Sequence, residues 1–233
     1  MEKHKKNGII INGIFALLIV IASVVFLLSP YSSYITKTIA SLLFLLCGVF
    51  NFFYCKKYFN ENFNLKFALF MLAGLLFSAL GDILLIDFFI AGAILFGIGH
   101  VFYFVSFCFL KKFKWYDLIS GAVIFIGVFM LIQFYPQFVF DGMKPLVLVY
   151  AFIISLMLGK AVGNVYTQKD KWLNIYVLTG AFLFFFSDAM LLFFKFGGRQ
   201  IEYDIWCVIT YYLAQAILSC SIFSHVFLKN DKN

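Results

Sequence analysis

Long apolar stretches recur eight times along this chain, each close to the length that a helix needs to cross a membrane. A helix crosses the ~30 Å hydrocarbon core with about 20 residues. Only 12% of the 233 residues are charged, and the mean hydropathy is +0.99. The sequence therefore predicts one integral-membrane domain over residues 1–233, an all-α polytopic bundle of about eight transmembrane helices. The expected spans are 8–28, 34–54, 65–86, 88–110, 115–135, 145–163, 172–194 and 205–228.

Other classes of protein fit the composition poorly. A membrane β-barrel needs alternating apolar and polar residues, and runs such as FALLIVIASVVFLL do not alternate. The net charge of +7 comes from lysines that punctuate apolar spans, so no nucleic-acid partner is expected. The five cysteines lie in or beside apolar segments without a CxxC motif, which is typical of small buried hydrophobes. The expected surroundings are membrane lipids, and no obligate protein partner is evident.

The lysines indicate an orientation. All but four of the 18 basic residues fall on one side of the predicted bundle, together with both termini. The four exceptions are Lys37, Lys144, Lys195 and Arg199. Cytoplasmic loops are rich in lysine and arginine, so both termini are predicted to be cytoplasmic. The expected location is the bacterial inner membrane.

Two aspartates lie inside predicted spans, Asp82 in GLLFSALGDILL and Asp188 in GAFLFFFSDAMLL. A carboxylate near the bilayer interior costs roughly 2.5–3.5 kcal/mol on insertion scales. Such residues are kept where they face a polar cavity and act there. Two carboxylates close together in an apolar site can share one proton, so that one acts as an acid and the other as a base. A paired-carboxylate catalytic site is therefore the leading hypothesis.

Four polar groups should share one layer of the membrane. Asp82 follows Lys66 by 16 residues, and Asp188 follows Lys171 by 17, which places both roughly 24 Å into the core. Lys37 and Tyr150 enter from the opposite side at about the same depth. Asp82 and Asp188 are 106 residues apart and Lys37 and Lys144 are 107 apart. A parallel repeat of four helices would produce this spacing, although similar helices can also do so by chance.

Further polar residues are candidates for substrate binding. Lys37 either balances an aspartate, holds an anionic headgroup or snorkels to the interface. Ser78 and Ser187 have hydroxyls that could bond a carboxylate, and His100 could relay a proton or orient one. The remaining candidates, Tyr150, Tyr211, Tyr212 and Gln215, could line a cavity or simply join helices. The three histidines lie at different depths, so no three-histidine zinc site is expected.

The sequence resembles the YhhN family of eight-span membrane proteins, whose characterised members are lysoplasmalogenases. The likeness covers most of the chain, although Thr38 stands where the family often has proline. It rests on Thr36-Lys37, SALGDILL (Ser78–Leu85), FGIGHVFY (Phe96–Tyr103), Tyr150 with Met157, GAFLFFFSDAMLL (Gly180–Leu192) and TYYLAQ (Thr210–Gln215).

The resemblance implies hydrolysis of the vinyl ether bond of a lysoplasmalogen, a lysophospholipid, to a fatty aldehyde and a glycerophospho-headgroup. An enol ether is hydrolysed by protonation at carbon, followed by attack of water on the oxocarbenium ion. Asp82 and Asp188 could supply the acid and the stabilising anion, with either in either role. Lys37 could bind the lipid phosphate. No metal or organic cofactor is required.

Three alternatives stay open. A lipid or small-molecule transporter would also hold charges at mid-membrane, but Pro30, Pro136 and Pro145 all lie at span ends, so broken helices are not indicated. A hydrolase of another lipid class, acting on an ester or amide, would need a metal or an activated nucleophile. A sensor or structural protein would use the buried charges only to hold its helices in register.

Overall fold

The computed structural model describes residues 2–29, 33–166 and 170–228, and the regular elements within them are all helical. Eight long helices form the molecule, and each is long and apolar enough to cross a membrane. The predicted all-α membrane bundle is thus confirmed for the described residues. The helices are α1 (Glu2–Leu28), α2 (Ser33–Tyr58), α3 (Leu65–Leu84), α4 (Phe89–Leu110), α5 (Trp115–Phe134), α6 (Lys144–Val165), α7 (Lys171–Phe196) and α8 (Ile201–Leu228), with a short 3-10 helix η1 (Asn60–Asn62) after α2.

Local signals explain several helix starts. The side chain of Asn64 caps α3 by accepting a hydrogen bond of 3.1 Å from the Phe67 amide. Asp117 accepts one of 2.8 Å from the Lys114 amide at the start of α5. Pro145 stands in the first turn of α6, where its missing N–H has no helical partner to lose. Each cap fixes where a span begins relative to its neighbours.

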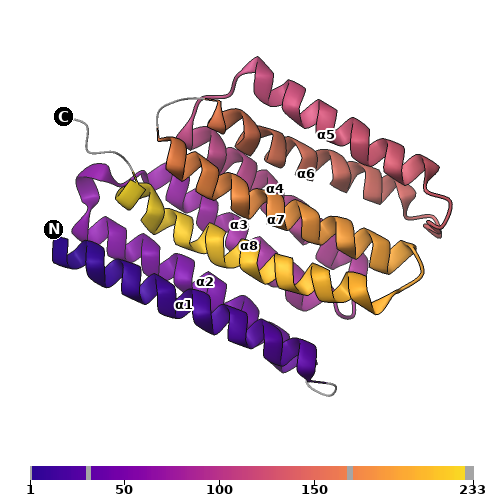
Figure 1. Ribbon diagram of the computed structural model, residues 1–233, viewed down its shortest axis with the longest axis horizontal. Coiled ribbons are helices and arrows are strands. Elements are labelled where there is room, and N and C mark those ends of the chain that lie inside the picture. The colour runs from indigo at the N-terminus through magenta and orange to yellow at the C-terminus, as the bar shows by residue number, and fades with distance from the viewer. Residues whose placement is uncertain (1, 30–32, 167–169, 229–233) are drawn as a thin grey trace.

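Six helices close into a ring and two lie outside it. Neighbours around the ring are α2, α3, α4, α6, α7 and α8, and α8 returns to pack on α2. Helix α1 packs against α2 and α8, and α5 packs against α6 (Figure 1). The start of α1 and the end of α8 lie at the same end of the bundle. Which membrane side this end faces, and whether the two halves are repeats, stay predictions.

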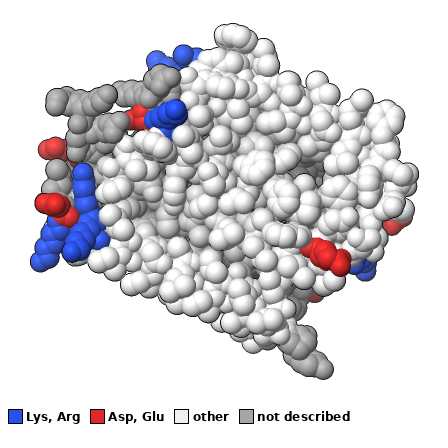
Figure 2. Space-filling model, viewed as in Figure 1, with Lys and Arg blue, Asp and Glu red and all other residues white. Residues whose placement is uncertain are grey.

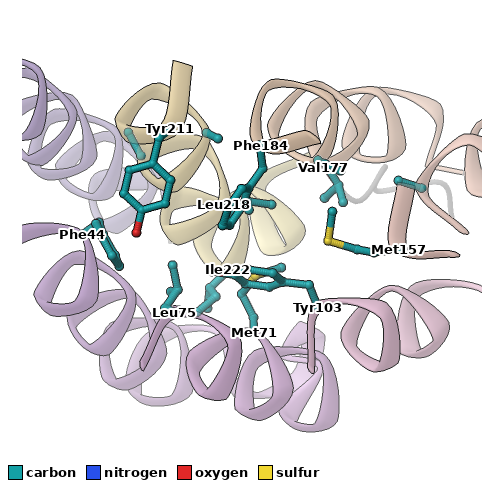
Figure 3. Packing of buried hydrophobic residues seen from close by; sticks show 14 of the residues in the cluster. Phe44, Met71, Leu75, Tyr103, Met157, Val177, Phe184, Tyr211, Leu218 and Ile222 are labelled. Carbon is teal, nitrogen blue, oxygen red and sulfur yellow. The ribbon is translucent and has the colours of Figure 1, made fainter. Parts of the chain in front are cut away.

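The core fills the centre of this ring. Figure 3 shows buried side chains from all six ring helices converging there, among them Phe44 of α2, Tyr103 of α4 and Met157 of α6. Helix α8 supplies several of the central residues, including Leu218 and Ile222, and contacts α1, α2, α3 and α7. The ring is therefore tied together mainly around α8.

The outside of the bundle suits lipid rather than water. Large apolar side chains such as Leu17 (60%), Val123 (64%) and Phe134 (73%) are exposed. Figure 2 shows charged groups gathered at the two ends of the visible face, with an uncharged band between them. An apolar band between charged ends is the pattern of a protein that spans a bilayer.

The turn between α3 and α4 brings Asp82 close to the next helix. Helix α3 ends at Leu84 and α4 starts at Phe89, so the connection around Asp87 is only four residues long. Gly92 makes this turn possible, because a Cβ there would lie 2.7 Å from the Leu85 Cα and 2.9 Å from the Gly81 carbonyl oxygen. The close approach of the two backbones holds the last turn of α3, and with it Asp82, against the ring interior.

Candidate active site

The Asp82 carboxyl group has three polar partners on two other helices. The Lys37 Nζ lies 3.0 Å from Oδ1. Ser41, one turn further along α2, places its hydroxyl 2.6 Å from Oδ2, and the Tyr212 hydroxyl of α8 donates to the same oxygen over 2.7 Å. The Asp82 side chain is only 4% exposed. These contacts tie the end of α3 to α2 and α8 through one buried side chain.

Asp188 is bonded through one oxygen and leaves the other free. The Tyr150 hydroxyl donates to Oδ2 over 2.6 Å, and His100 Nε2 lies 3.1 Å from the same oxygen. Within the described chain Oδ1 has no hydrogen-bond partner, and the side chain is 13% exposed. Asp188 therefore has two hydrogen-bond partners where Asp82 has three.

His100 contacts both Tyr150 and Asp188. Its Nε2 also lies 2.8 Å from the Tyr150 hydroxyl, while its Nδ1 is buried without a partner in the described residues. Since Tyr150 donates its proton to Asp188, its oxygen is available to accept one from His100. His100 is fully buried, so it orients Tyr150 and Asp188 rather than meeting the cavity itself.

Both aspartates line one cavity of about 310 Å³. Lys37, Tyr211 and Tyr212 also line it, and further charged side chains stand around it at the end of the bundle away from the termini. These charged residues are Lys195, Arg199 and Asp204. Both carboxyl groups thus face the same space, each with its own set of partners, and their action as a catalytic pair stays a prediction.

Asp188 also borders two apolar cavities. One, of about 60 Å³, runs between Leu146, Ala93 and Leu192. The other, of about 180 Å³, lies beside Leu131 of α5. Tyr150 lines both of them. Asp188 thus stands where a charged cavity and apolar spaces meet.

The comparisons with known proteins give one match. The model of the YhhN family matches residues 32–222, which is most of the 233-residue chain and runs from α2 into α8. The chain belongs to the YhhN family. No curated protein and no solved structure among those compared matches it.

The YhhN match covers all the site residues expected from sequence, but the structure separates them into two groups. Those at the cavity or on its aspartates are Asp82, Asp188, Lys37, Tyr150, Tyr211, Tyr212 and His100. Ser78, Ser187 and Gln215 are fully buried elsewhere. Ser187 donates to the Phe184 carbonyl of its own helix, Ser78 meets the Tyr103 hydroxyl, and Gln215 accepts a bond from Tyr103. Neither serine reaches an aspartate, so the expected serine–carboxylate bonds are absent from the described structure.

Sequence reasoning missed four residues around the YhhN site. Ser41 bonds Asp82, and its signal was available, since it lies one helical turn after Lys37. Lys195, Arg199 and Asp204 line the cavity but sit at span ends, where charged residues are ordinary. Whether these three side chains reach the cavity depends on the direction in which the loop between α7 and α8 turns, and the sequence alone does not predict that direction.

No metal-binding group forms in the described part of this YhhN protein: no three histidine, cysteine, aspartate or glutamate side chains come together there. His100 is bonded to Tyr150 and Asp188. His4 stacks on Tyr58, and His225 stacks on Phe67.

Proposed function

We propose that this protein hydrolyses the vinyl ether bond of a lysoplasmalogen, releasing a fatty aldehyde and a glycerophospho-headgroup. The observation that supports this most directly is the position of Asp188 between a charged cavity and apolar ones. In a lysoplasmalogen the vinyl ether lies at the junction of the polar glycerophosphate and the hydrocarbon chain. A substrate placed with its headgroup in the charged cavity and its chain in an apolar one brings that bond to Asp188.

The proposed reaction begins with Asp188 as general acid. Its Oδ1 proton is transferred to the second carbon of the alkenyl chain, and the double-bond electrons form the new C–H bond. The first carbon then becomes an oxocarbenium ion conjugated with the ether oxygen. Tyr150 stabilises the carboxylate that Asp188 becomes, because it already donates to Oδ2, and His100 Nε2 lies 3.1 Å from the same oxygen. General acid catalysis of this kind contributes about 10²–10⁴-fold.

Asp82 supplies the negative charge that the cation needs. In this proposal Asp82 acts as a carboxylate that lies beside Lys37 and faces the same cavity. Water adds to the oxocarbenium carbon and gives its proton back to Asp188, forming a hemiacetal. The hemiacetal then breaks its bond to the glycerol oxygen, which takes the hydroxyl proton, and an aldehyde leaves. One water is consumed, and both carboxyl groups return to their starting states.

An ester or amide hydrolase fits the geometry less well. Such chemistry needs an activated nucleophile beside a base. Ser78 and Ser187 bond other groups rather than the aspartates, and neither lines the cavity. Ser41 does contact Asp82, but it is fully buried and is not part of the cavity wall. Protonation chemistry needs only the two carboxyl groups that the cavity presents.

The test is aldehyde release from a lysoplasmalogen by the detergent-purified protein, with and without EDTA. Asp188→Asn and Asp82→Asn are compared with Asp141→Asn, which makes the same change at an exposed loop position. We expect a loss of at least about 100-fold in kcat for Asp188→Asn, none for Asp141→Asn, and turnover that survives EDTA. A wild-type protein that releases no aldehyde, or an Asp188→Asn variant with full turnover, would contradict the proposal.

A further inference from the structure

We propose that Lys195, Arg199 and Asp204 form the headgroup site, and that they select a lysophospholipid whose headgroup carries both a phosphate and a primary ammonium. The two cations bind the phosphate, and the Asp204 carboxylate binds the ammonium of an ethanolamine headgroup. This inference rests on the proposed function, because it takes the reacting bond to lie at Asp188. It adds a substrate class that the two catalytic aspartates do not determine.

The three side chains are available to a ligand. All line the cavity that holds both aspartates, and within the described residues none of them is ion-paired, unlike Lys37. Lys37 is engaged by Asp82 at 3.0 Å, so it already neutralises a charge that belongs to the site. The phosphate is therefore left to Lys195 and Arg199.

The spacing of Asp188 and Lys195 along α7 allows Lys195 to reach the phosphate of a lysophospholipid whose ether bond lies at Asp188. Lys195 follows Asp188 by seven residues on the same helix, a rise of about 10 Å. Helical side chains lean toward the N-terminus, which brings the Lys195 ammonium back toward Asp188. Five bonds separate the vinyl ether oxygen from phosphorus, and an extended chain of five bonds spans roughly 6 Å at backbone-like bond lengths. A phosphate linked to a bond at Asp188 thus arrives within reach of Lys195.

The wall of the cavity holds these groups in place. The Lys195 Nζ lies 4.6 Å from the centre of the Phe89 ring, a cation–π contact that restricts the lysine. Arg199 follows in the loop and offers a planar fork that suits a phosphate. Asp204 stands in the first turn of α8, seven residues before Tyr211 of the same cavity. Cations on one side of the cavity and an anion from α8 complement a zwitterion.

Asp204 favours ethanolamine over other headgroups. A primary ammonium can donate hydrogen bonds to a carboxylate, whereas the trimethylammonium of choline has no N–H to donate. A glycerol headgroup has no positive charge and would place an anionic phosphodiester near Asp204 with no ammonium for the carboxylate to bond. The expected order of affinity is therefore ethanolamine, then choline, then glycerol.

The test measures binding without chemistry. Saturated 1-O-alkyl lysophospholipids have an ether with no double bond and cannot undergo the vinyl ether reaction. Their binding to the purified full-length protein is measured by native mass spectrometry for ethanolamine, choline and glycerol headgroups. We expect the ethanolamine lipid to bind wild type about tenfold more tightly than the glycerol lipid, as hydrogen bonds to charged groups commonly provide.

Two variants test the anionic and the cationic part of the proposed headgroup site separately. Asp204→Asn should remove the preference for ethanolamine and leave binding of the glycerol lipid equal or stronger. The double variant Lys195→Gln/Arg199→Gln should weaken all three lipids about tenfold or more. Lys144→Gln is the control, because Lys144 is a cation near the same end of the bundle that bonds Gln133 and does not line this cavity.

The results distinguish this inference from the proposed function. Equal binding of all three lipids by wild type, or wild-type preferences in Asp204→Asn, would overturn the headgroup site whether or not the protein releases aldehyde. The expected binding pattern without aldehyde release from the vinyl ether lipid would instead support the headgroup site and refute the reaction proposed for Asp188.

Discussion

The ion pair between Lys37 and Asp82 should stabilise the fold as well as the site. The two side chains lie 3.0 Å apart and are 13% and 4% exposed. Removing one member of such a buried pair typically costs 3–5 kcal/mol, because the remaining charge loses its partner. Lys37→Met leaves Asp82 with the Ser41 and Tyr212 hydroxyls, so we expect the lower end of this range, about 3 kcal/mol.

Substitution of Asp82 should lower the free energy of unfolding less than substitution of Lys37. Asp82→Asn leaves Lys37 unpaired, but Lys37 lines the cavity and can reach water or an anion there. We expect a loss of about 1–2 kcal/mol, since an unsatisfied charged partner that stays solvated costs less than a fully buried one. The double variant Lys37→Met/Asp82→Asn should lose less than the sum of the two, with a coupling energy of about 1–3 kcal/mol.

The measurement is a double-mutant cycle on the free energy of unfolding in mixed lipid and detergent micelles, followed by tryptophan fluorescence and repeated at two salt concentrations. Strictly additive losses would show that the two charges do not interact in the membrane. A Lys37→Met variant as stable as wild type would mean that Lys37 extends to the interface, and the reasoning from the buried pair would be refuted. Little dependence on salt is expected, because the pair is shielded from bulk solvent.

Three further results are expected from single substitutions. Tyr150→Phe should lower kcat for aldehyde release about tenfold or more, because it removes the 2.6 Å bond to Asp188; an unchanged kcat would contradict this. Ser187→Ala should keep turnover within about twofold of wild type, because its hydroxyl bonds only within α7, and a large loss measured in the same assay would place Ser187 in the site. Gly159→Leu should destabilise the protein by about 1–3 kcal/mol or more, since even a Cβ at this position would lie 2.3 Å from the Gly121 amide nitrogen; thermal unfolding at wild-type temperature would contradict the close α5–α6 contact.

The fold was largely predictable because the membrane imposes one simple rule. Backbone polar groups in lipid must bond within their own segment, so apolar stretches of the right length become helices. The predicted spans agree with the observed helices, and the largest differences lie at ends where polar residues extend a helix beyond the lipid, as at Glu2 before α1. The order of helices around the ring was not predictable, since apolar stretches of similar composition carry little information about their neighbours.

The two aspartates of the candidate site could be predicted from the sequence, whereas their hydrogen-bond partners could be predicted less well. Asp82 and Asp188 stood out because a buried carboxylate is costly, and helical rise placed them at one level. Their partners depend on helix rotation. Tyr212 bonds Asp82, while its neighbour Tyr211 donates to the Ser78 carbonyl instead. Successive side chains along a helix point about 100° apart, so only the packed structure decides which tyrosine meets the carboxylate.

The partners of the two aspartates come from four helices, and this links the proposed catalysis to assembly of the bundle. Lys37 and Ser41 lie on α2, Tyr212 on α8, His100 on α4 and Tyr150 on α6, so the carboxyl groups are satisfied only when the ring is closed. A loss of turnover in an Asp82 variant can therefore reflect a partly open bundle. Within the described residues one Asp188 oxygen has no hydrogen-bond partner, so Asp188→Asn can retain the contacts to the other oxygen and remove only the proposed acid. For this reason substitution of Asp188 is the cleaner test of the chemistry, and substitution of Asp82 needs the folded fraction measured in parallel.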